Sequence, residues 1–78
     1  MDRPQINYAE TGKKIRAFRR ALGKSAAEMA DEMCIVEMGW YKYEQGKCLP
    51  KTYEDLFYLA RILGTTVDNI VVFYDDAS

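Results

Sequence analysis

Few side chains in this chain of 78 residues are suited to catalysis or to metal binding. Histidine is absent, which removes the usual general base and the commonest metal ligand at neutral pH. The two cysteines, Cys34 and Cys48, have neither C-x-x-C spacing nor the histidine partners of a four-ligand zinc site. We therefore expect no enzymatic activity, no cofactor and no bound metal.

The two cysteines also indicate the cellular compartment of the protein. Free thiols in a reducing compartment are the expected state, with a disulfide as the alternative, and this favours a cytoplasmic location. No apolar run approaches the ~20 residues that a membrane span requires, and no signal peptide is expected. We expect no membrane partner.

The side chains that could bind a ligand are basic ones, and they are unevenly distributed. The stretch from residue 1 to 24 has a charge balance of +5, whereas the rest of the chain has −6 and the whole −1. Its seven basic residues are Arg3, Lys13, Lys14, Arg16, Arg19, Arg20 and Lys24. This asymmetry indicates one basic face that could bind phosphate groups. An ordinary solvated amphipathic helix is the other explanation, and charge alone does not decide between them.

The elements that must position these residues are five short helices joined by tight turns. Asn7 with Glu10, Ser25 with Glu28, and Thr52 have the types and spacing of helix starts. The predicted helices cover about residues 7–23, 25–33, 36–45, 52–64 and a short segment from 66. Apolar spacing predicts three buried faces: Tyr8, Ile15, Phe18 and Leu22; Met29, Ala30 and Met33; and Leu56, Leu59, Ala60 and Leu63.

Length and composition favour one globular domain, because 49% of the residues are apolar and 29% are charged. We expect residues 1–6 to be a flexible arm, 7–74 the domain and 75–78 an acidic tail. The four apolar residues Val71, Val72, Phe73 and Tyr74 could finish the last helix or form an extended edge. Since all four cannot face one small core, we expect them to form an oligomer contact.

Several motifs follow one another between about residues 9 and 71. They are Gly12-Lys-Lys-Ile-Arg, Leu22-Gly-Lys-Ser-Ala-Ala-Glu-Met-Ala, Tyr43-Glu-Gln-Gly-Lys47 before Leu49-Pro50, Leu59-Ala-Arg-Ile-Leu-Gly64 and Val67-Asp68. Their order and spacing resemble the Cro/C1-type (XRE-like) helix-turn-helix family. The resemblance implies an all-α fold, a compact five-helix bundle of the lambda-repressor type.

The resemblance also implies a function and a site. It implies a sequence-specific DNA-binding transcriptional regulator, a homodimer on double-stranded DNA, with the helix at about 36–45 in the major groove. The family positions that contact DNA fall on Ser25, Ala26, Glu37, Met38, Tyr41, Lys42, Gln45 and Lys47. A structural ion pair is expected between Arg19 and Glu44. For Trp40 we expect core packing, with a partner-binding hot spot as the alternative.

A second function stays open because the sequence departs from the family pattern at the expected interface. Ala26 stands where the family usually has a glutamine, and Cys34 stands where the turn commonly has a glycine. Glu37 would repel phosphates, and Gly39 lies in the middle of the expected recognition helix. The alternative is a degenerate helix-turn-helix module that binds a protein partner, antitoxin-like or phage-inhibitor-like.

Overall fold

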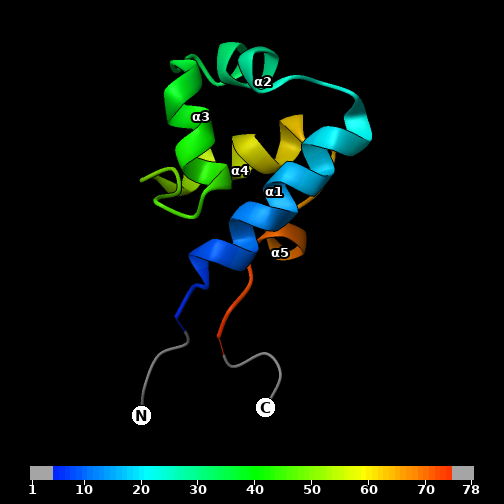
Figure 1. The fold of residues 1–78 in the computed structure, drawn as a ribbon. Coiled ribbons are helices and arrows are strands. Elements are labelled where there is room, and N and C mark those ends of the chain that lie inside the picture. Colours follow the sequence, from blue (N-terminus) through cyan, green and yellow to red (C-terminus); the bar gives the residue numbers. More distant parts are fainter. Residues whose placement is uncertain (1–4, 75–78) are drawn as a thin grey trace.

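The computed structural model describes residues 5–74, and this range contains five α-helices and an isolated antiparallel bridge. The helices are α1 (Tyr8–Leu22), α2 (Ala26–Glu32), α3 (Glu37–Glu44), α4 (Tyr53–Ile62) and α5 (Val67–Ile70). Figure 1 shows α2 and α3 next to each other at one end of the molecule, with α1 crossing in front of α4. The predicted all-α fold is confirmed.

The helix boundaries follow from local hydrogen bonds that the sequence indicates. Asn7 and Thr52 each accept a bond from the amide three residues later, at 3.1 Å in both cases. Ser25 and Glu28 form a complete capping box, so α2 has the strongest start. α1 ends at Gly23, whose φ of 71° lies in the left-handed region that glycine tolerates without strain.

The turn between α2 and α3 bends at Cys34. Its φ of 59° is unusual for a residue with a side chain, and the turn is closed by bonds from the Cys34 amide to the Asp31 carbonyl (3.1 Å) and from Ile35 to Ala30 (3.0 Å). The exposed cysteine therefore occupies the turn conformation for which the family commonly uses glycine.

The core lies where the middle of α1 meets the other helices. Its largest fully buried side chains include Trp40, Ile15, Met29 and Leu59. The predicted inward faces of α2 and α4 are confirmed, with Met33 and Leu56 partly buried against the core. The prediction for α1 was wrong at Tyr8 and Leu22, which are 43% and 44% exposed. These are the first and last residues of α1, and the core covers only the middle of that helix.

The two ends of the described chain run side by side (Figure 1). Ile6 forms the antiparallel bridge with Phe73, and the Asn7 amide donates to the Val72 carbonyl at 2.7 Å. The buried Thr11 hydroxyl accepts from the Val72 amide at 2.9 Å. The Tyr74 amide donates to the Gln5 carbonyl at 3.0 Å. Gln5 and Ile6 are therefore paired rather than part of a free arm, while residues 1–4 and the tail 75–78 lie outside the described range.

The C-terminal apolar segment is an extended edge, which settles the choice that the sequence left open. Val71 packs against the core, and Val72 and Phe73 are partly buried; only Tyr74, at 63%, is exposed. The chain itself covers most of this segment, so burial does not require an oligomer contact at Val71, Val72, Phe73 and Tyr74, and that contact stays a prediction. Within residues 5–74, no helix has the length and apolar composition needed to cross a bilayer.

Candidate nucleic-acid interface

α3 presents one face to the core and the opposite face to solvent. Trp40 is fully buried and Tyr43 is partly buried, which confirms core packing for the tryptophan. Burial raises the pKa of the Tyr43 phenol. Five of the side chains that the resemblance assigns to DNA lie on the exposed side of this helix or at its end: Glu37, Met38, Tyr41, Lys42 and Gln45. Met38 is 67% exposed and Tyr41 40%.

The exposed face is held by a hydrogen-bonded cluster underneath it. Arg19 of α1 contacts both carboxylate oxygens of Glu44, through Nε at 2.5 Å and through Nη2 at 3.3 Å. Trp40 Nε1 donates to Glu44 Oε2 at 2.6 Å. The two charged side chains are 13% and 6% exposed. The hydrogen bond to Glu44 raises the pKa of the Arg19 guanidinium. The two contacts between Arg19 and Glu44 hold α3 in position on α1.

A cleft of about 460 Å³ lies beside this cluster, between α1 and α3. Arg16 and Arg20 line it from α1, and Tyr41 and Gln45 line it from α3. Both arginines are exposed and lie one helical turn apart. Their guanidinium groups can therefore contact the same anion beside α3. The cleft thus joins part of the basic helix to the predicted recognition helix.

The basic residues of the N-terminal third divide into two groups. Three of them form ion pairs within the chain: Lys13 with Glu10 at 3.0 Å, Lys24 with Glu32 at 2.8 Å, and Arg19 with Glu44. The bond to Glu32 also raises the pKa of Lys24. Within the described residues, three others have no side-chain partner: Lys14, Arg16 and Arg20. Only the second group is therefore available to a ligand, and these ion pairs do not decide between a phosphate-binding face and a solvated helix.

The start of α2 corrects one predicted contact. Ala26 is 4% exposed and belongs to the core cluster with Met29 and Ala30, so its methyl group cannot reach DNA. Ser25 is exposed, but its amide donates to Glu28 Oε1 at 2.9 Å and its hydroxyl accepts from the Glu28 amide at 3.1 Å. Hydrogen bonding to the Ser25 backbone amide, and next to the Ser25 side chain, lowers the pKa of the Glu28 carboxyl.

Lys47 follows α3 after the left-handed Gly46 and is exposed. The structure thus brings the predicted residues of α3 and Lys47 onto neighbouring exposed positions, leaves Ser25 exposed at the start of α2, and removes Ala26. The cleft between α1 and α3 was not predicted from the sequence. Its signal was the expected pair of Arg19 with Glu44, because that pair places the next residues, Arg20 and Gln45, across from each other.

The sequence is similar to a known protein family over most of its length. A family described as a helix-turn-helix domain matches residues 2–71. The chain is also 40% identical over 52 residues to the cryptic phage CTXphi transcriptional repressor RstR of Vibrio cholerae. The aligned part is 67% of this chain and 46% of the repressor, so the chain spans about half the length of the curated relative that it matches.

Two solved structures show the same fold at low sequence identity. The clp gene regulator ClgR from Corynebacterium glutamicum has a TM-score of 0.72 at 22% identity, over 81% of this chain and 66% of ClgR. Hydroxypropylphosphonic acid epoxidase from S. wedmorenis has a TM-score of 0.77 at 17% identity, over 83% of this chain and 34% of the epoxidase. These likenesses concern the fold alone. The family match, together with the α2–turn–α3 unit, shows that the chain belongs to the helix-turn-helix family, of the Cro/C1 type that its motifs resemble.

Proposed function

We propose that this protein is a sequence-specific DNA-binding regulator of transcription whose α3 enters the major groove. The observation that supports the proposal is the exposed face of α3. Glu44 anchors this helix from below, and the side chains of Lys42 and Gln45 have no partners among the described residues. In the helix-turn-helix arrangement, the second helix of the pair lies in the groove. The repressor that the sequence matches and the regulator that shares the fold support the same function.

The residues of α3 have chemistry suited to base edges. Lys42 can donate to O6 and N7 of guanine, and Gln45 can pair with adenine or contact the backbone. Met38 offers an apolar surface for a thymine methyl group, and Glu37 can accept from N4 of cytosine. α3 therefore carries the side chains needed to contact base edges directly.

Phosphate contacts come from the flanks of α3. Arg16 and Arg20 face the cleft beside Tyr41, and Lys47 and Ser25 are exposed at the far end of α3 and at the start of α2. Contacts of this kind position a protein on the duplex and make affinity depend on salt. We place the protein in the cytoplasm as a homodimer on a two-fold site; the free thiols of Cys34 and Cys48 suit a reducing compartment.

Selection of bound duplexes from a random pool, at low and at moderate salt, tests the proposal. We expect enrichment of a motif, with a two-fold arrangement if two copies bind together. Lys42→Ala in the same selection should lose preference at one base position of each half-site. If no motif is enriched at either salt concentration, the protein is not a sequence-specific DNA binder.

The second candidate function is binding of a protein partner through the start of α3. It is favoured by the composition of that surface, where Val36 is 73% exposed and Met38 67%, with the acidic Glu37 between them. An exposed apolar pair is typical of a protein contact. In that case the selection yields no motif, and Met38→Asp abolishes capture of the partner, whereas Lys42→Ala does not.

A further inference from the structure

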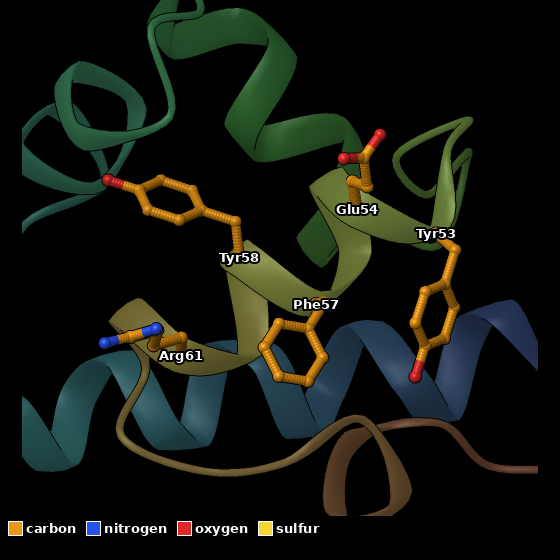
Figure 2. Close-up of a pocket in the computed structure, with 5 residues that line it drawn as sticks. All are labelled: Tyr53, Glu54, Phe57, Tyr58 and Arg61. Carbon is orange, nitrogen blue, oxygen red and sulfur yellow. The ribbon is translucent and has the colours of Figure 1, made fainter.

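The outer face of α4 carries three aromatic side chains that the described chain leaves largely exposed. Tyr53 is 69% exposed, Phe57 52% and Tyr58 46%. With Glu54 and Arg61 they line a hollow of about 440 Å³, and Figure 2 shows all five side chains projecting from this helix. Tyr53 and Phe57 lie against each other, with ring centroids 6.2 Å apart. We call these five residues the α4 face.

The α4 face is symmetric in its charges. Glu54 and Arg61 are seven residues apart, about two helical turns or ~10.5 Å along the axis. Phe57 and Tyr58 occupy the midpoint between them. At about 100° per residue, all five side chains fall within an arc of about 140° around α4. Neither Glu54 nor Arg61 has an ion-pair partner within residues 5–74.

We propose that the α4 face binds the same face of a second copy of this chain, with the two α4 helices antiparallel about a two-fold axis between Phe57 and Tyr58. In that arrangement Glu54 of each copy meets Arg61 of the other, so one contact forms two ion pairs. A two-fold interface requires this kind of self-complementarity. The proposal rests on the homodimer of the proposed function and names the surface through which it forms, but it does not depend on DNA binding.

The α4 face supplies the apolar part of the area that a two-fold interface needs. The exposed parts of its three aromatic rings amount to roughly 300–400 Å² per chain. A standard interface takes about 800 Å² from each partner, with an apolar aromatic centre and a polar rim. The aromatic residues supply such a centre, and Glu54 and Arg61 lie at its edges. The C-terminal edge does not compete for this role, because it pairs with residues 5–7 of its own chain.

Charge reversal in sedimentation-equilibrium measurements on the full chain, without DNA, tests the arrangement. We expect the unmodified protein to dimerise at micromolar concentration. Glu54→Arg or Arg61→Glu alone should weaken the dimer at least tenfold, because like charges then meet twice. An equimolar mixture of the two variants should restore association, since every reversed charge in the mixed dimer faces an opposite one. The double variant Glu54→Arg/Arg61→Glu should restore it too.

The controls separate the interface from effects on folding. Asp31→Lys reverses an exposed charge on α2 and should leave the dimer unchanged. Phe57→Ser should weaken the dimer without any change in charge. Circular dichroism checks that each variant keeps its helices. A monomeric unmodified protein at several hundred micromolar would overturn the proposal and leave the α4 face to a different protein. A dimer that tolerates both single reversals, or single variants that fail to associate when mixed, would overturn it as well.

Discussion

Trp40 and Glu44 lie one turn apart on α3, and the indole Nε1 donates to the same carboxylate oxygen that accepts from Arg19 of α1. One oxygen atom therefore joins the largest buried side chain to the neighbouring helix. Since the carboxylate is almost fully buried, the position of α3 depends on an interaction that water cannot easily replace.

Removing this carboxylate should destabilise the protein strongly. We expect Glu44→Ala to cost roughly 3–5 kcal/mol in the free energy of unfolding, because it leaves a buried guanidinium and a buried indole N–H without an acceptor. Glu44→Gln should cost less, since the amide oxygen can still accept one bond. Glu10→Gln removes the exposed pair with Lys13 and should cost no more than about 1 kcal/mol. Urea denaturation measures all three, and equal losses for Glu44→Ala and Glu10→Gln would contradict the prediction.

Two helical glycines should respond to alanine in opposite directions. A methyl group at Gly12 would lie 2.7 Å from the carbonyl oxygen of Tyr43 and would also overlap that of Glu44. Because both are backbone atoms, we expect Gly12→Ala to cost roughly 1–3 kcal/mol.

Gly39 on α3 is the matched control for Gly12 on α1. A methyl group there meets nothing closer than Ile35 Cδ1, at 3.5 Å, which is ordinary contact. Gly39→Ala should therefore raise the free energy of unfolding by about 0.5–1 kcal/mol, since alanine loses less backbone entropy in a helix. Thermal melts of the two variants give the signs, and a stabilised Gly12→Ala protein would show that α1 and α3 do not approach so closely.

Variants at a proposed phosphate contact and at a proposed base contact should affect DNA binding differently. Arg20→Ala should weaken binding to the selected site and to random DNA alike, and should reduce the slope of log affinity against log salt by about 1. Lys42→Ala should cost about 1–3 kcal/mol on the selected site and little on random DNA. Lys13→Ala is the control on the same helix, because Lys13 is engaged with Glu10. A Lys13→Ala protein as impaired as Arg20→Ala would argue against a phosphate contact in the cleft.

The capping box of α2 should make stability depend on pH. Hydrogen bonds from Ser25 lower the pKa of Glu28 below its ordinary value of 4.5. The unfolded chain then binds this proton more readily than the folded one, so the contribution of the carboxylate is complete above pH 4.5 and is lost as the pH falls through the folded pKa. The stability difference between the unmodified protein and Glu28→Gln should therefore shrink between neutral pH and about pH 3. The same difference at both pH values, by denaturant titration, would contradict this.

The amino-acid sequence by itself determined the helix boundaries. Bonds such as Asn7 with Glu10, Ser25 with Glu28 and Thr52 with Asp55 join residues three positions apart, so side-chain type and spacing suffice to predict them. The inward position of Leu59 follows from helical periodicity, whereas that of Trp40 was expected from the family resemblance. The family resemblance added the Arg19 and Glu44 positions, which 25 residues of chain separate.

Other features depended on which helices pack together, and only the tertiary structure decided them. The basic residues of the N-terminal third look alike in the sequence, yet Lys24 has an acidic partner on α2, Glu32, while Arg16 and Arg20 face the cleft with α3. The Val72 amide finds its acceptor on Thr11, 61 residues away, and this contact turns an apolar tail into part of the fold. Periodicity shows which residues share a helix face, but not whether another part of the chain covers that face. This is why Ala26 proved to be buried while Phe57 remained exposed.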